Sequence, residues 1–225
     1  LIKMDEIEDY AFKIIMVGNT AVGKTSILYR YTRENTDTLC MQPTIGVDFG
    51  TKRLVMENKC IKMNVWDTAG LEKYRAITRA YFRNIAGAVI VFDLTNVQSF
   101  IKIPLWKEEI IKHTNNPELQ FVMVGNKSDL QDKVVICDSE IQKMAYSLNI
   151  DFIKTSVLED RNIHFIFDKL ACKILNNCKH YNKINFISDP DNPSKYTEKF
   201  GIRYNHKVNQ LLEVDNEEPK NSSCS

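Results

Sequence analysis

The sequence predicts an α/β fold: a mostly parallel, six-stranded sheet with helices on both faces. Short, continuous apolar runs such as 86–92 and 121–125 are typical of strands that are buried on both faces. Helix-length amphipathic segments alternate with these runs, which favours strand–helix–strand units and a parallel sheet. Polar, glycine-containing motifs follow several of the runs, at the sheet edge where ligands bind in such folds.

The individual elements follow from hydrophobic periodicity and turn residues. The strands are expected at 12–17, 49–56, 61–66, 86–92, 121–125 and 151–153. The helices are expected at 24–31, 99–113, 138–148 and 162–177. The turn-like Glu57-Asn58-Lys59 predicts that the second and third strands form a hairpin.

The chain has room for one domain and a tail. Of its 225 residues, 44% are hydrophobic and 26% are charged, which is ordinary for a globular protein. We expect a short N-terminal extension at 1–9 and a folded domain at 10–178. Residues 179–225 are rich in Asn, Lys, Asp, Ser and Pro, so we expect a flexible tail.

Composition argues against several classes of function. The formal charge is only +1, whereas nucleic-acid binders usually carry a marked basic excess, so no nucleic-acid partner is expected. No stretch approaches the roughly 18 apolar residues of a membrane span, and the first residues lack an apolar signal core. The six cysteines are scattered without metal-ligand spacing, so we expect a reduced, cytosolic compartment.

A phosphate-binding loop follows the first predicted strand. Residues 18–25 match G-x-x-x-x-G-K-[ST] and open the first predicted helix, which is the context that the motif requires. Lys24 can place its charge on the phosphates, and the Thr25 hydroxyl suits Mg²⁺. Backbone N–H groups and the helix N-terminus supply further anion contacts. The loop indicates a P-loop NTPase, and its candidate ligand-binding residues are Gly18, Asn19, Thr20, Ala21, Val22, Gly23, Lys24, Thr25 and Ser26.

A second loop, at 126–129, offers the means to select the base. The Asp129 carboxylate can accept hydrogen bonds from the two adjacent donors of a guanine ring, a pair that adenine lacks. The Lys127 stem can lie along the ring while its ammonium stays in water. Asn126 belongs to the same motif, and a third loop with Ser156, Val157 and Leu158 offers backbone N–H groups to the guanine O6.

Two further segments are candidate γ-phosphate sensors. Asp67 ends a predicted strand and can hold the Mg²⁺ shell, and Gly70 can bring its N–H against the γ-phosphate. Thr44 lies in the long connection after the first helix and can offer a second hydroxyl to the metal. We therefore expect Thr25, Thr44 and Asp67 to be the metal ligands. Both segments would be held only while the γ-phosphate is bound.

Together these motifs resemble the Ras superfamily of small GTPases, and within it the Rab family, over residues 10–178. Rab-like stretches include Ile45-Gly46-Val47-Asp48-Phe49, Lys62-Met63-Asn64-Val65-Trp66, Lys73-Tyr74-Arg75-Ala76-Ile77-Thr78, Tyr81-Phe82-Arg83 and Val91-Phe92-Asp93-Leu94-Thr95. The resemblance implies a GTP/GDP switch that binds Mg²⁺ and regulates vesicle traffic. It also implies an effector-facing surface of Ile45, Phe49, Trp66 and Tyr81. A role for these aromatic residues as partly buried core remains open.

The resemblance also implies a set of partners. They are effector proteins, an exchange factor, a GTPase-activating protein and a GDP dissociation inhibitor, acting on a monomeric core. A prenylated C-terminus would hold the protein reversibly on the cytosolic face of an intracellular membrane. The sequence ends Cys224-Ser225, which fits neither C-a-a-X nor paired cysteines, so we suspect a truncated terminus.

The main departure from the family pattern is Leu71, where the family has Gln. In the family, Lys24 and Thr44 would assist hydrolysis, while the Gln orients the attacking water. Leucine has neither donor nor acceptor, so we predict slow hydrolysis and a bias to the GTP form. An engineered origin is favoured because the other motifs are complete.

Two alternatives remain. If Leu71 is native, the protein is a pseudo-GTPase that acts as a nucleotide-dependent scaffold. A different P-loop class, such as a nucleotide kinase or an ATPase, is disfavoured by the 126–129 loop.

Overall fold

The computed structural model describes residues 8–33, 46–68, 81–182, 196–199 and 202–205. Along the chain these form β1 (Tyr10–Val17), α1 (Lys24–Thr32), β2 (Val47–Met56), β3 (Lys59–Thr68), β4 (Gly87–Asp93), α3 (Val97–Ile101), α4 (Ile103–His113), β5 (Gln120–Asn126), a 3₁₀ turn (Gln131–Lys133), α5 (Asp138–Leu148), β6 (Asp151–Lys154), α6 (Ile163–Asn182), β7 (Tyr196–Lys199) and β8 (Ile202–Asn205).

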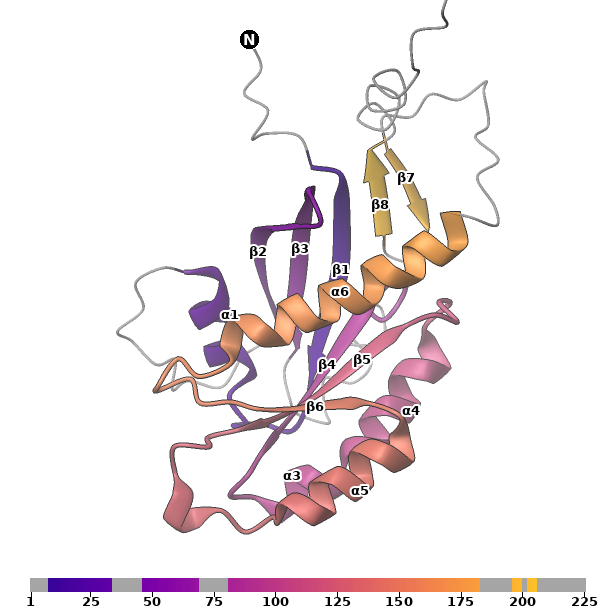
Figure 1. The fold of residues 1–225 in the computed structure, drawn as a ribbon. Coiled ribbons are helices and arrows are strands. Elements are labelled where there is room, and N and C mark those ends of the chain that lie inside the picture. The colour runs from indigo at the N-terminus through magenta and orange to yellow at the C-terminus, as the bar shows by residue number, and fades with distance from the viewer. Residues whose placement is uncertain (1–7, 34–45, 69–80, 183–195, 200–201, 206–225) are drawn as a thin grey trace, which may run out of the picture.

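The central sheet confirms the predicted fold class. Its strand order is β2-β3-β1-β4-β5-β6. β2 and β3 are antiparallel, and the remaining pairs along this order are parallel. α6 runs diagonally across the sheet in Figure 1. The carboxyl ends of the parallel strands meet at one edge, which places the predicted motifs there.

Two hydrophobic clusters pack on the two faces of the sheet. β1 contributes Ile14 and Met16 to one cluster, together with residues of α1 and α6. It contributes Ile15 and Val17 to the other, together with residues of α3, α4 and α5. This alternation along one strand is the two-residue period of a strand covered on both faces.

The β2–β3 hairpin is tighter than predicted. The sequence suggested a turn at Glu57-Asn58-Lys59, but Lys59 already pairs with Met56 as the first residue of β3. Glu57 and Asn58 form the two-residue turn, with φ angles of 51° and 58°. Positive φ at both positions is typical of the turn whose twist matches that of the flanking strands.

The helix predicted at 99–113 is two helices. α3 ends at Ile101 and α4 begins at Ile103, and Pro104 lies in the first turn of α4. Proline has no backbone N–H and cannot continue the hydrogen bonding of a preceding helix, so the chain breaks at Lys102.

Two strands extend the sheet beyond the six that the sequence predicts, making eight in all among the described residues. β8 pairs antiparallel with Tyr10–Phe12 of β1, and β7 pairs with β8. The space beside these residues is open because β4 begins to pair with β1 only at Ile14. Ile202 packs against the cluster that includes Tyr10 and Cys178.

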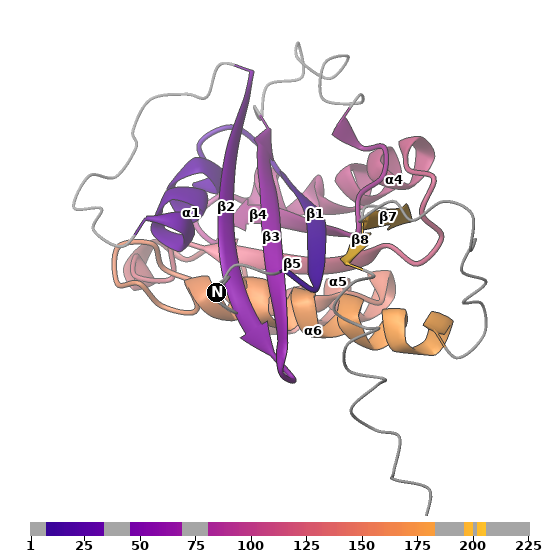
Figure 2. The same ribbon diagram turned by 90° about the horizontal axis from the view of Figure 1, so that it is seen from above.

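The region 179–225, where a flexible tail is expected, contains regular structure that the sequence analysis did not predict. α6 continues to Asn182, and β7 and β8 extend the sheet through the pairing of β8 with β1. The polar composition of the whole tail concealed a local run of strand-forming residues around Gly201. Figure 2 shows β7 and β8 at the same end of the sheet as the C-terminal part of α6.

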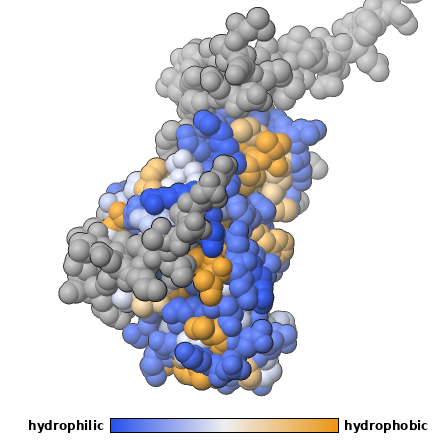
Figure 3. All heavy atoms as spheres, turned by 90° about the vertical axis from the view of Figure 1, so that its left-hand side faces the viewer, coloured by the Kyte–Doolittle hydropathy of each residue, from blue (hydrophilic) through white to orange (hydrophobic). Residues whose placement is uncertain are grey.

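On the side of the molecule shown in Figure 3, apolar residues form separate areas bordered by hydrophilic residues. Among the residues that the structure describes, no helix combines the length and apolarity needed to cross a bilayer.

Candidate functional site

The phosphate-binding loop connects β1 to α1 and depends on two glycines. Gly18 and Gly23 have φ angles of 145° and 97°. A Cβ on Gly18 would lie 2.1 Å from the Val91 carbonyl oxygen, and one on Gly23 would lie 2.3 Å from Nδ2 of Asn126. Both positions therefore require glycine for space as well as for conformation. Ala21 is left-handed too, with a φ of 62°, although it carries a side chain.

Lys24 lies inside this loop and is only 5% exposed. Its Nζ donates to the carbonyl oxygens of Gly18 (3.0 Å) and Asn19 (2.9 Å). Burial lowers the pKa of Lys24 to about 8, and the charge of Asp67 partly offsets this effect. A buried ammonium held by neutral carbonyls is a suitable partner for an anion, because a bound phosphate would compensate for its desolvation.

Two of the three predicted metal ligands are in contact. The Thr25 hydroxyl, at the start of α1, donates a hydrogen bond to the carboxylate of Asp67, near the end of β3. Asp67 is fully buried. One hydroxyl and one carboxylate provide hard oxygen ligands, which fits Mg²⁺ with phosphate and water completing its shell. Thr44, the third predicted ligand, lies outside the described residues.

Asp129, in the candidate base-reading loop at 126–129, is held by the neighbouring loop that contains Ser156. The Ser156 hydroxyl donates to Oδ1 of Asp129 at 2.6 Å, and the Glu159 N–H donates to the same hydroxyl at 3.1 Å. The predicted third loop therefore positions Asp129 through the Ser156 side chain, in addition to any backbone N–H groups that it offers. The Ser156 N–H donates to the Arg161 carbonyl, so Val157 and Leu158 are the remaining candidates for the guanine O6.

Asn126 joins the base-reading loop to the phosphate-binding loop. Its Nδ2 donates to the Val22 carbonyl at 2.9 Å, and its Oδ1 accepts from the Thr155 hydroxyl at 3.3 Å. Asn126 and Thr155 are both buried. The side chain that the sequence grouped with the base readers thus connects three loops.

Lys127 differs from expectation. Its ammonium does not simply stay in water, because it forms an ion pair with the buried Asp93 at 2.6 Å. This contact fixes the lysine stem beside the loop, and Asp93 itself is held by the Thr95 N–H at 2.8 Å. In the sequence, Asp93 stood out only as part of a family-like stretch.

The predicted aromatic surface residues are adjacent. The rings of Phe49 and Trp66 are 4.6 Å apart between centroids, and those of Trp66 and Tyr81 are 5.2 Å apart. Phe49 is 47% exposed, while the other two are partly buried. We call these three residues the aromatic patch. Ile45, Gly70 and Leu71 lie outside the described residues.

Sequence reasoning missed two contacts at the candidate site because they join residues far apart in the sequence. The Trp106 indole Nε1, on α4, donates to Oδ1 of Asn19 at 3.2 Å across 87 residues. Thr155 reaches Asn126 across 29 residues. No local pattern signals either contact; only the parallel sheet order brings these elements together.

Comparison with known proteins agrees with this geometry. A model of the Ras family matches residues 13–176. The Ras-related protein RABA4b of Arabidopsis thaliana is 38% identical over 183 residues, covering 81% of this chain and 80% of the relative. This chain belongs to the Ras family and is a Rab small GTPase.

Other relatives extend the same match. The Ras-related protein Rab11D of Nicotiana tabacum is 37% identical, covering 85% of this chain and 86% of the relative. The GTP-binding protein ypt3 of Schizosaccharomyces pombe is 40% identical over 166 residues, covering 74% of this chain and 77% of the relative. As in other Ras-family GTPases, the ligand class of this Rab is GTP and GDP.

Proposed function

We propose that this Rab is a GTP/GDP switch in vesicle-mediated membrane traffic. The observation that carries the proposal is the connection between its two recognition loops. Asp129, which would read the base, lies on the same loop as Asn126, whose amide holds the Val22 carbonyl of the phosphate-binding loop at 2.9 Å. A ligand that satisfies both loops must carry a guanine and a phosphate chain at a fixed separation.

Each part of the nucleotide has named residues. The Lys24 ammonium and the N–H groups of 18–25 would hold the phosphates. The Asp129 carboxylate would accept from the base, with Lys127 along its ring. Thr25, Asp67 and Thr44 would hold Mg²⁺, which bridges and neutralises phosphate oxygens when bound.

The GTP form would be read through the aromatic patch and Ile45. Clustered aromatic residues that are partly exposed are typical of protein interfaces. Thr44 and Gly70 would sense the γ-phosphate and set the conformation of the segments beside the patch. The expected partners are effectors in the GTP form, with an exchange factor and an activating protein acting on the switch.

Leu71 would make hydrolysis slow. The leucine side chain cannot position a water molecule by hydrogen bonding, so the switch would stay mostly in its GTP form. The Leu71→Gln variant should hydrolyse GTP at least tenfold faster, measured as phosphate released in single turnover. An unchanged rate, with and without an activating protein, would place the defect elsewhere.

A natural pseudo-GTPase that acts as a scaffold is the second candidate, and Leu71 is the residue that favours it. In that case Leu71→Gln alone would not restore a working cycle, because other parts of the hydrolytic machinery would have diverged as well. The response of the variant to an activating protein therefore separates the two functions.

The first experiment identifies the bound nucleotide. The protein is purified with Mg²⁺, denatured, and its released nucleotide is analysed by ion-exchange chromatography. We expect guanine nucleotide, with GTP exceeding GDP. Competition between GTP and ATP for the emptied protein is the control, and equal competition by ATP would contradict the proposal.

If the terminus is intact, membrane attachment would use a prenyl group on Cys224, with the GDP dissociation inhibitor extracting the lipidated protein. A single lipid gives only marginal membrane affinity, which suits reversible attachment to the cytosolic face. Incubation of a chain whose C-terminus is extended to a complete prenylation motif, with prenyl donors and transferases, should label Cys224, with Cys224→Ser as the control. An equally labelled Cys224→Ser variant would contradict this assignment.

A further inference from the structure

Side chains from outside the phosphate-binding loop hold it at two points. At its distal half, Asn126 Nδ2 donates to the Val22 carbonyl at 2.9 Å. At its proximal half, Trp106 Nε1 donates to Asn19 Oδ1 at 3.2 Å. Between these points, Thr20 and Ala21 are exposed.

The Trp106 contact has a defined direction. An indole N–H can only donate, so the atom of Asn19 that faces it must be the amide oxygen. Trp106 is 6% exposed and belongs to the cluster that includes Ile103 and Ile110 of the same helix. Because its large ring is packed in the core, the indole is a rigid donor.

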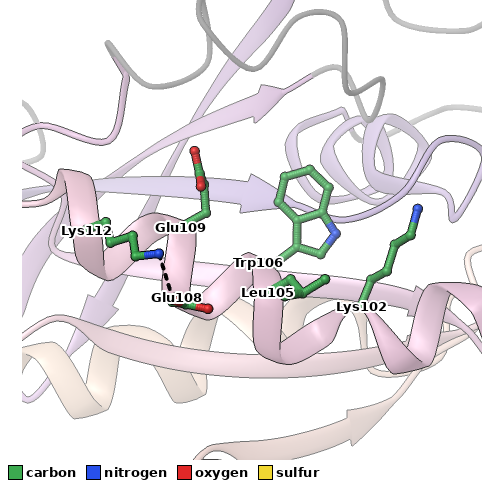
Figure 4. Close-up of a pocket in the computed structure, with 6 residues that line it drawn as sticks. All are labelled: Lys102, Leu105, Trp106, Glu108, Glu109 and Lys112. Carbon is green, nitrogen blue, oxygen red and sulfur yellow. Dashed lines mark ion pairs between the residues drawn. The ribbon is translucent and has the colours of Figure 1, made fainter.

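Figure 4 shows how the ring is presented. Trp106 rises from α4 beside a hollow of about 160 Å³, which is lined by Lys102, Leu105, Trp106, Glu108, Glu109 and Lys112. Its ring nitrogen is on the side toward Lys102, away from the Glu108–Lys112 ion pair (2.7 Å).

Asn19 passes this restraint to the lysine that would bind phosphate. The Asn19 side chain accepts from Trp106, while its backbone carbonyl accepts from Lys24 Nζ at 2.9 Å. The Lys24 ammonium also donates to the Gly18 carbonyl at 3.0 Å. A movement of Asn19 would therefore move one of these two acceptors, which together orient the ammonium.

The backbone conformation of Ala21, in the middle of the loop, is a second reason why the hydrogen bond to Asn19 matters. Ala21 has a φ of 62°, a left-handed conformation that is unfavourable for a residue with a Cβ. A strained conformation persists where its surroundings hold it. The anchors at Asn19 and Val22 are placed on either side of Ala21, where they resist relaxation of the loop.

We propose that Trp106 is a positioning residue for nucleotide binding: its indole N–H fixes Asn19, and through Asn19 the ammonium of Lys24. This role requires no direct contact between Trp106 and the nucleotide. The proposal rests on the proposed function, since it concerns the retention of a guanine nucleotide.

The test removes the indole N–H of Trp106 while keeping an aromatic ring at that position. Trp106→Phe keeps a buried aromatic side chain but has no donor. Loss of one hydrogen bond to a neutral acceptor should raise the release rate of a fluorescent GDP analogue by about three- to tenfold. Ile110→Val is the matched control, because it alters the packing of the same helix without a contact to the loop; its release rate should stay at the wild-type value.

A double-mutant cycle tests whether Trp106 acts through Asn19. Asn19→Ala should raise the release rate to the same extent as Trp106→Phe, and the double variant should release no faster than either single variant. An unchanged rate in Trp106→Phe, or effects that multiply in the double variant, would overturn the proposal.

Rescue supplies a measurement that general destabilisation would not reproduce. Asn19→Asp keeps an acceptor for the indole, so it should release more slowly than Asn19→Ala when Trp106 is present. In the Trp106→Phe background this advantage should disappear. If Trp106→Phe does not fold, Asn19→Ala and Asn19→Asp decide the matter alone: equal release rates would overturn the proposal.

These outcomes are distinguishable from failure of the proposed function. If the wild-type chain retains no guanine nucleotide, the proposed function fails before any variant is compared. If the wild type retains it and Trp106→Phe releases it at the wild-type rate, only the role of Trp106 fails.

Discussion

The Thr25 hydroxyl donates a hydrogen bond to the Asp67 carboxylate, so the start of α1 is joined to the end of β3. These residues are 42 positions apart; α1 follows the phosphate-binding loop, and β3 pairs with β1, which precedes it. Asp67 is fully buried, so its charge requires nearby donors or a cation. Under the proposed function, the pair would supply two of the ligands of a magnesium site.

Asp67→Asn tests this site. The amide retains an acceptor for Thr25 but removes the negative charge that would attract Mg²⁺. At millimolar Mg²⁺ we expect GDP release to accelerate by tenfold or more, the range seen when metal-site residues are altered. The measurement is release of a fluorescent GDP analogue with Mg²⁺ and with EDTA.

In the wild type, EDTA should accelerate release strongly, whereas in Asp67→Asn it should have little further effect. Asp151→Asn is the control, since this carboxylate pairs with Lys173 on α6 at 3.0 Å. A variant that kept the full response to EDTA would contradict the assignment of Asp67.

Gly23→Ala tests the geometry of the phosphate-binding loop. The added Cβ would lie 2.3 Å from Asn126 Nδ2 and would be forced into a left-handed conformation. The conformational penalty alone is about 1–2 kcal/mol. We expect GDP affinity to fall at least tenfold by isothermal titration calorimetry, together with a lower melting temperature.

The Gly46→Ala variant is a useful comparison. Gly46 also has a positive φ, 89°, but no atom of the described residues lies within 4 Å of the position that a Cβ would take there. It should therefore suffer conformational strain without steric overlap, and lose less affinity than Gly23→Ala. Equal losses in the two variants would show that contact with Asn126 is unimportant.

Because β8 pairs with the start of β1, the backbone amides of Tyr10–Phe12 should be protected from hydrogen exchange. Ile202→Pro removes a backbone donor from β8 and a side chain that packs against the core cluster. Amide hydrogen exchange at Tyr10–Phe12 should become faster, while exchange in β4 and β5 stays slow. Hydrogen exchange followed by mass spectrometry measures this.

A chain ending at Asn205 is the control for the hairpin, because it retains β7 and β8. Its exchange at Tyr10–Phe12 should match that of the full chain. Equal protection in the Ile202→Pro variant would contradict the pairing of β8 with β1.

The sequence alone predicted the elements that depend on local pattern. α5 lies at the predicted residues 138–148, and the apolar runs at 86–92 and 121–125 coincide with β4 and β5 to within one residue at each end. These elements are continuous and strongly periodic, and their side chains are buried as the pattern requires.

The structure differs from the sequence-based prediction where contacts between residues far apart in the sequence determine it. The strand at 202–205 depends on an open edge that β1 leaves because β4 begins late. In the candidate site, Asp93 holds Lys127 and Trp106 holds Asn19, contacts that sheet order creates between separate segments. The glycine motif, by contrast, could be recognised from the sequence because each glycine is required by the backbone conformation at its own position.

Under the proposed function, the Asp129 carboxylate, held by Ser156, would select guanine. The measurement is the affinity of the emptied protein for GDP and for xanthosine diphosphate, with Asp129→Asn beside the wild type. Xanthine carries an oxygen where guanine carries its amino group, so an amide donor at position 129 suits it better than a carboxylate. We predict that the wild type prefers GDP and that Asp129→Asn reverses this preference by at least a hundredfold in the ratio of affinities. An Asp129→Asn variant that kept the wild-type preference for GDP would contradict the account.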